Sequence, residues 1–170
     1  MEVVKYPKVL SLYVTTRGYS YTLFEAPLSL YDWGIKRIER GDKNKQSLAS
    51  IEHLLARFAP SALVIEDTSE TSSRRSARAR KLYREIEKLA DKYLIDTYCY
   101  AQEMVVKCFG ESVPKTKHEI ALRIAEVIPA LANRLPPKRK IWLPQDPRQS
   151  LFDAAALGIT FYTIHGENFV

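Results

Sequence analysis

The sequence predicts an α/β fold with a five-stranded mixed sheet and helices on both faces. Three strand-like segments follow one another near the N-terminus, and short apolar segments then alternate with helical ones. A three-strand antiparallel meander followed by β-α-β crossovers adds two parallel strands to the same sheet. The chain has 170 residues, of which 46% are hydrophobic. Since this is the usual length of one domain with a real core, we expect residues 1–170 to form a single domain.

The meander is predicted from β-branched and aromatic residues separated by turns. Residues 8–16 form the first strand, Arg17-Gly18 reads as a turn, and residues 19–25 form the second strand. Residues 28–38 form the third, with Gly34 indicating a bulge in its interior.

The crossovers occupy the middle of the chain. A helix with apolar residues at helical spacing follows the break at 41–44 and ends at Pro60. Residues 62–65 are uninterruptedly apolar, as in a buried central strand. The Ser- and Thr-rich linker 68–73 is suited to capping the next helix, and residues 95–100 form the fifth strand.

The C-terminal third is predicted to be helical with one long loop. Residues 101–109 form a short helix, and Thr116 and Glu119 have the spacing of a capping box that opens the next one. Residues 135–143 form a basic, proline-flanked loop. Asp146 is expected to cap the last helix.

Basic residues gather in two segments of a chain whose net charge is +6. Residues 73–94 hold eight bases and three acids, and residues 134–148 hold five bases and one acid. This clustering favours an anionic partner, most simply nucleic acid; the alternative is a solvated helix face. Trp142, in the second segment, is expected either to stack on a base or to pack under its loop.

Other sequence features bear on location. No apolar run reaches the ~18 residues of a membrane span, and the N-terminus lacks the apolar stretch of a signal peptide. Cys99 and Cys108 form no metal motif and fit a reducing compartment. We therefore expect a cytoplasmic protein without membrane contact.

Two isolated acids stand in apolar surroundings and need a partner. Glu66 closes the buried strand 62–65, and Asp153 lies within the apolar helix 150–158. An unpaired buried carboxylate is costly, and a bound metal ion is one common remedy.

The element order is that of the ribonuclease H-like fold, and within it the chain resembles the Holliday-junction resolvases of the RuvC type. The resemblance covers nearly the whole chain. It is carried by Val9–Tyr13, Leu63–Asp67, Lys107, Lys117 and Ser150–Leu157.

This resemblance implies a site of four carboxylates around two Mg²⁺ ions, a pair that stabilises the attacking and leaving oxygens of a phosphodiester. Glu66 and Asp153 stand in register as the catalytic and metal-binding acids. Tyr13 and Ser150 fall where the family has Asp. Because a phenol is a poor Mg²⁺ ligand and a serine brings no charge, we expect a degenerate metal site.

Both remaining acids also have candidate partners within the chain. Glu66 is expected to pair with Lys107 or with a base of the following helix, if it does not bind metal. Asp153 has Lys117 or Arg148 as the corresponding partner.

Three functions remain open at this point. The first is binding of branched or duplex DNA over a degenerate site, mainly through phosphates. The second is Mg²⁺-dependent cleavage by a structure-selective endonuclease, and the third is a non-catalytic assembly role; a homodimer is compatible with each. The residues assigned to nucleic-acid contact are Arg74, Arg75, Arg78, Lys107, Lys117, Lys138, Arg139 and Lys140.

Overall fold

The computed structural model describes residues 8–69, 74–110 and 116–166. Its sheet has the strand order β3-β2-β1-β4-β5, in which β1, β2 and β3 are antiparallel neighbours and β1, β4 and β5 are parallel. The predicted five-stranded mixed sheet is thereby confirmed. The strands are β1 (Val9–Val14), β2 (Gly18–Ala26), β3 (Ser29–Arg37), β4 (Ala62–Glu66) and β5 (Asp96–Tyr100).

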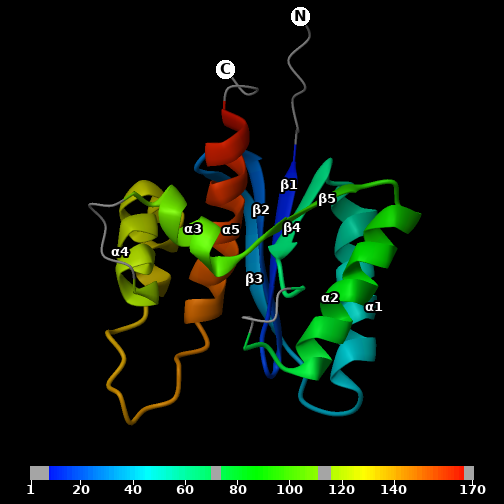
Figure 1. Ribbon diagram of the computed structural model, residues 1–170, viewed down its shortest axis with the longest axis horizontal. Helices are drawn as coiled ribbons and strands as arrows, with labels where there is room; N and C mark the ends of the chain where they lie inside the picture. Colours follow the sequence, from blue (N-terminus) through cyan, green and yellow to red (C-terminus); the bar gives the residue numbers. More distant parts are fainter. Residues whose placement is uncertain (1–7, 70–73, 111–115, 167–170) are drawn as a thin grey trace, which may run out of the picture.

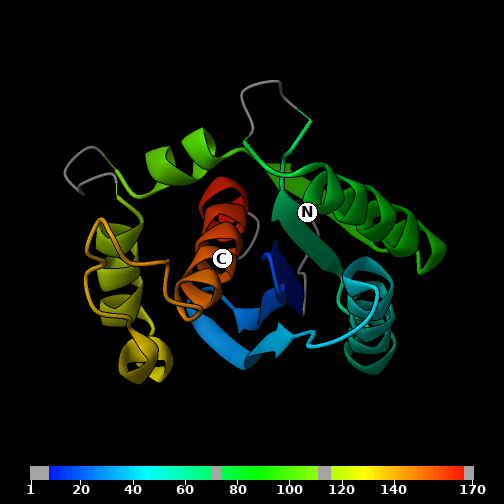
Figure 2. The same ribbon diagram turned by 90° about the horizontal axis from the view of Figure 1, so that it is seen from below.

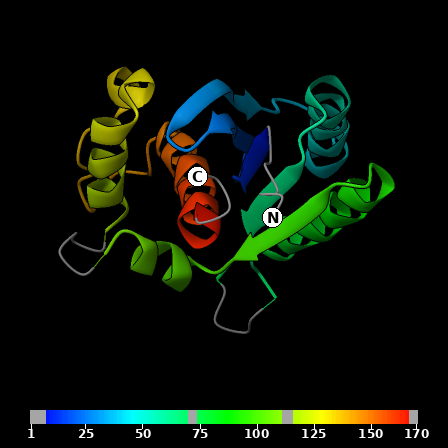
Figure 3. The ribbon, with the colours of Figure 1, turned by 90° about the horizontal axis from the view of Figure 1, so that it is seen from above.

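Helices cover both faces of this sheet, as predicted (Figures 1, 2 and 3). Two helices pack on one face and one long helix packs on the other, with the shorter helices outside it. The first pair is α1 (Lys43–Phe58) and α2 (Ala77–Lys92), and the long helix is α5 (Gln149–His165). The shorter ones are α3 (Gln102–Cys108), α4 (Lys117–Val127) and the 3-10 helix η1 (Pro129–Arg134).

The predicted bulge at Gly34 is wrong. Gly34 pairs regularly with Tyr21, and the register shifts lie around Phe24 instead. A Cβ at position 34 would lie 2.9 Å from the Tyr21 ring, so the glycine makes room for that aromatic side chain. The missing side chain serves cross-strand packing here.

One predicted helix cap is confirmed by the structure, and two other predicted caps are wrong. The capping box of Thr116 and Glu119 is present. Ser76, outside the predicted linker 68–73, caps α2; residues 70–73 lie outside the described part of the chain. Asp146 does not cap α5, because its carboxylate accepts from the backbone and guanidinium of Arg148, before the helix begins.

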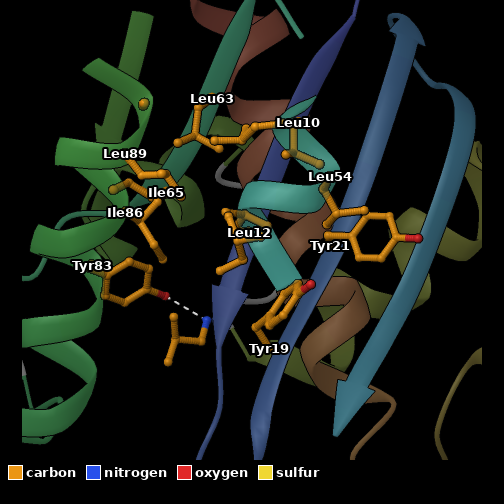
Figure 4. Packing of buried hydrophobic residues seen from close by; sticks show 14 of the residues in the cluster. Leu10, Leu12, Tyr19, Tyr21, Leu54, Leu63, Ile65, Tyr83, Ile86 and Leu89 are labelled. Atoms are coloured by element: carbon orange, nitrogen blue, oxygen red, sulfur yellow. Dashed lines mark hydrogen bonds between the residues drawn. The ribbon is translucent and has the colours of Figure 1, made fainter. Parts of the chain in front are cut away.

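Within β1, and likewise within β4, successive side chains point to opposite faces of the sheet. Leu10, Leu12 and their neighbours pack against α1 and α2, as Figure 4 shows. In that layer the Val14 N–H donates to the buried Tyr83 phenol at 2.9 Å. Val9 and Val64 lie in the opposite cluster, against α5. Since every second residue of a strand shares a face, Tyr13, four residues after Val9, also lies on the α5 side of the sheet.

Polar contacts and one close approach hold α5 in place on the sheet. The Ser11 hydroxyl donates to the Ala154 carbonyl at 2.7 Å, and the Ser20 and Ser150 hydroxyls lie 2.6 Å apart. A Cβ on Gly158 would meet the Phe24 ring at 2.2 Å, so this glycine lets α5 approach β2 closely. These contacts determine the rotation of the helix about its axis, and hence where its acid points.

Within the described ranges, no helix is both long and apolar enough to cross a lipid bilayer.

Candidate functional site

The two isolated acids meet at one small pocket on the α5 side of the sheet. Tyr13, Glu66, Lys117 and Asp153 all contribute to its lining. Tyr13 comes from β1, Glu66 from the end of β4, and Asp153 from the first turns of α5. The carboxyl ends of parallel strands are where open α/β sheets place their ligands. The topology has thus joined residues up to 140 positions apart in the sequence.

Glu66 is held by a cation and a phenol of the protein itself. The Arg75 Nε lies 3.4 Å from the Glu66 Oε2, and both side chains are largely buried. The Tyr83 hydroxyl donates to the same oxygen at 3.2 Å, while it accepts from Val14. Arg75 also donates to the Val14 carbonyl and lies over the Tyr13 ring, 5.0 Å from its centroid. Glu66 therefore pairs with Arg75, which precedes α2, and not with Lys107.

Asp153 has a cation of its own. The Lys117 Nζ lies 3.3 Å from the Asp153 Oδ2 and donates to the Tyr13 phenol at 3.0 Å. The Gln149 amide donates to the Asp153 Oδ1 at 3.4 Å. The alternative in which Asp153 pairs with Lys117 is confirmed, whereas Arg148 bonds to Asp146.

The pKa values of this cluster depend most on burial and secondarily on neighbouring charges. Burial raises the pKa of Asp153, and the Lys117 charge offsets this only in part. Burial alone would lower the pKa of the Lys117 ammonium, but Asp153 and Tyr13 together raise it. Burial, with the nearby Asp153 carboxylate, raises the pKa of Tyr13 above 10.0. The phenol is therefore neutral at physiological pH and brings no charge for a metal.

A carboxyl titration checks this picture. We expect NMR of carboxyl-labelled protein, assigned with Asp153→Asn, to show the Asp153 pKa above its ordinary 3.8. A raised pKa means that folding favours the protonated carboxyl group. The stability that Asp153 contributes is therefore fully present below the pKa of the unfolded state. It is lost as the pH rises through the folded-state pKa. As the pH rises from the unfolded-state pKa to the folded-state pKa, the unfolding free energy of wild type should fall relative to that of Asp153→Asn. A pKa below 3.8 would contradict the burial argument.

Ser150 is not among the residues that line the pocket. Its hydroxyl donates to the Pro147 carbonyl at 2.7 Å and pairs with Ser20, so it faces β2. The neighbour of Asp153 is Gln149, one turn before it on the same face of α5. Sequence reasoning missed Gln149 and Tyr83. It offered the bases of the following helix as partners of Glu66, and the structure identifies that partner as Arg75. The i,i+4 spacing to Asp153 was the one signal for Gln149.

The residues present do not fit a pair of Mg²⁺ ions. Among the described residues, Glu66 and Asp153 are the two carboxylates that line the pocket, and each is already paired with a cation. The described residues contain no group of three or more His, Cys, Asp or Glu side chains placed to hold a metal. The cavity volume is about 10 Å³, roughly the room for one water molecule. Mg²⁺ keeps several waters, so the pocket as it stands leaves no space for it.

The basic residues assigned to nucleic-acid contact divide into two groups. Arg75 and Lys117 hold the two acids, and Arg78 donates to the Thr15 carbonyl and the Asn44 side chain, both at 2.9 Å. These three are therefore engaged within the protein. The others are exposed and make no ion pair with a described residue: Arg74, Lys107, Lys138, Arg139 and Lys140.

The expectation that Trp142 packs under its loop is wrong, since 77% of this residue is exposed. The loop between η1 and α5 extends beyond the ends of the helices that it joins (Figure 1). Figure 1 also shows that α2 and α5 begin at the same end of the molecule as this loop. The loop and the segment that precedes α2 therefore lie toward the same end of the molecule, on opposite sides of α5 (Figures 1 and 2).

This strand order, with α5 packed across the sheet and its acid facing the end of β4, defines a ribonuclease H-like fold of the type found in RuvC resolvases. Comparison by sequence finds no matching family model and no matching curated protein. The fold itself is similar to that of Thermus thermophilus RuvC, with a TM-score of 0.66 at 17% identity over 94% of this chain and 96% of that one.

Two further solved structures share the fold. Thermus thermophilus RuvC in complex with a Holliday-junction substrate has a TM-score of 0.66 at 16% identity, covering 94% of this chain and 95% of that one. The yeast mitochondrial Holliday-junction resolvase Ydc2 has a TM-score of 0.63 at 13% identity, covering 97% of this chain and 82% of that one. The predicted RuvC-type fold is confirmed by these matches.

Proposed function

We propose that this protein binds branched or duplex DNA through its phosphates and does not cleave it. The observation that carries the proposal is the charge balance of the pocket. Arg75 on Glu66 and Lys117 on Asp153 neutralise the two acids with side chains of the protein. Breaking such a largely buried pair leaves an uncompensated charge, so a metal ion would have to displace a cation from each acid.

The exposed cations support DNA as the partner. Arg74, Lys138, Arg139 and Lys140 lie toward one end of the molecule, and no described acid pairs with them. Exposed bases bind phosphates and release counterions, which gives affinity without reading sequence. One of the structures with this fold was solved in complex with a Holliday-junction substrate, which makes branched DNA the first ligand to test.

The test is binding of a labelled four-way junction over a range of salt concentrations. We expect affinity to fall linearly on logarithmic axes as salt rises. Lys138→Ala should reduce the slope by about 1, as the loss of one phosphate contact does. Lys88→Ala is the matched control, because Lys88 is an exposed lysine toward the other end of α2. A salt-independent affinity, or equal effects of the two variants, would overturn the assignment.

The same preparation tests cleavage. We expect the junction to remain intact with Mg²⁺ or Mn²⁺ at concentrations where it is fully bound. Products that appear with metal and disappear in Asp153→Asn would establish the endonuclease instead. The homodimer remains a prediction, which light scattering with and without the junction measures.

A further inference from the structure

The loop between η1 and α5 presents three consecutive apolar side chains to solvent. Ile141 is 92% exposed, Trp142 77% and Leu143 48%. Single exposed apolar residues are ordinary on a protein surface, but a contiguous apolar tip indicates an interaction site. The pocket described above uses none of these residues.

A tight turn displays the tip outward. The Leu143 N–H donates to the Lys140 carbonyl at 3.0 Å, which makes Ile141 and Trp142 the two central residues of the turn. Pro136, Pro137 and Pro144 flank this segment. Each proline fixes its own φ angle, which reduces the number of conformations that the loop loses on binding. The apolar residues are therefore held out at low entropic cost.

The charges around the tip decide what it binds. Lys138, Arg139 and Lys140 are exposed, and none forms an ion pair with a described residue. The Lys140 Nζ lies 5.6 Å from the centroid of the Trp142 ring. Lysine is depleted at protein–protein interfaces, and two of these three cations are lysines, which favours a polyanion as the partner. An aromatic ring beside free cations matches the stacking platforms that bind unpaired nucleotides.

The position of the loop agrees with this occupant. It lies at the same end of the molecule as the start of α2, which Arg74 precedes (Figure 1). An anionic lipid surface also attracts bases and tryptophan. However, interfacial membrane binding generally uses the long apolar face of an amphipathic helix, and this tip is a single turn. Nucleic acid fits both the charge and the small apolar area.

We propose that Trp142 stacks on an unpaired base of DNA while Lys138 and Arg139 contact the adjoining phosphates. The protein then prefers DNA with unpaired bases, at a bulge or branch point, over a fully paired duplex. This inference rests on the proposed DNA-binding function and adds a substrate preference to it.

The experiment compares two duplexes that differ by a three-base bulge. We expect Trp142→Ala to weaken binding of the bulged duplex roughly tenfold, as the loss of one stacked base does, with less than a twofold change for the unbulged one. Lys138→Ala should weaken both by the same factor, because phosphate contacts do not distinguish them. Trp142→Phe should retain most of the preference. The exposure of the indole means that none of these changes should affect folding.

A second readout uses the indole itself. The chain contains two tryptophans, so Trp33→Phe leaves Trp142 as the sole reporter. The bulged duplex should quench its emission more strongly than the unbulged duplex does at equal occupancy.

The possible outcomes test the stacking proposal and the DNA-binding proposal separately. If Trp142→Ala binds both duplexes as wild type does, the stacking proposal fails and the DNA-binding function stands. If wild type binds neither duplex, both fail. A Trp142 response to phosphatidylserine vesicles, with none to the bulged duplex, would overturn the proposal in favour of a lipid surface.

Discussion

Replacing Arg75 by alanine is expected to destabilise the folded protein by about 3 kcal/mol, as removal of one partner from a buried ion pair does. The substitution leaves the largely buried Glu66 carboxylate with the Tyr83 phenol as its remaining partner among the described residues. It also removes the guanidinium from the Tyr13 ring and the Val14 carbonyl. Urea unfolding followed by circular dichroism measures the change.

The chain supplies a matched control one residue away. Arg74 is exposed and makes no ion pair with a described residue, so Arg74→Ala should change stability by less than about 0.5 kcal/mol. Arg75→Ala combined with Glu66→Gln should recover much of the loss, because no buried charge is then left unpaired. If Arg75→Ala is as stable as Arg74→Ala, or the double variant recovers nothing, Arg75 does not neutralise Glu66.

A second large effect is expected from rebuilding a metal site. Tyr13→Asp combined with Lys117→Met would place three carboxylates around the pocket and remove one of the two cations that pair with its acids. In the absence of metal, we expect this variant to lose about 3–5 kcal/mol, since buried charges lack partners. Mn²⁺ should recover much of that loss, because a ligand that binds only the folded state stabilises it. Thermal unfolding with and without Mn²⁺ measures both effects.

The control variant has a side chain of the same shape at position 13 but without the negative charge. Tyr13→Asn with Lys117→Met should show no stabilisation by Mn²⁺, and wild type should show none either, because its acids are already paired. A wild-type protein stabilised by Mn²⁺ as strongly as the triple-carboxylate variant would mean that Arg75 and Lys117 yield readily to metal. The endonuclease would then be the better reading of the site.

Much of the fold was predictable because its signals are local. Alternating and continuous apolar segments specify strands, and 3.6-residue periodicity specifies helices, so the order of elements follows from short windows of sequence. Gly34 shows where such reading fails. A glycine within a strand indicates a bulge on local grounds, but here it accommodates the ring of Tyr21, thirteen residues away in the sequence.

The candidate site was predictable in part. Glu66 and Asp153 stand out because each is a lone acid in an apolar segment, and the structure brings them to one pocket. The resemblance to the RuvC-type resolvases predicts Ser150 at a substituted ligand position beside Asp153. The Ser20–Ser150 contact turns that side chain toward β2, and Gln149 takes its place beside the acid. The rotation of a helix depends on what it packs against, which its own sequence does not state.

By itself, the sequence determined the mixed sheet, the two acids that need partners and the clustering of bases, because these are properties of composition and short-range periodicity. Only the tertiary structure decided that Arg75 holds Glu66, that Lys117 holds Asp153 and that Trp142 stands free. Long charged side chains reach many acceptors, and the one they find depends on which distant strands and helices meet. The physical reason is that pairing energies are set by distance and burial in three dimensions.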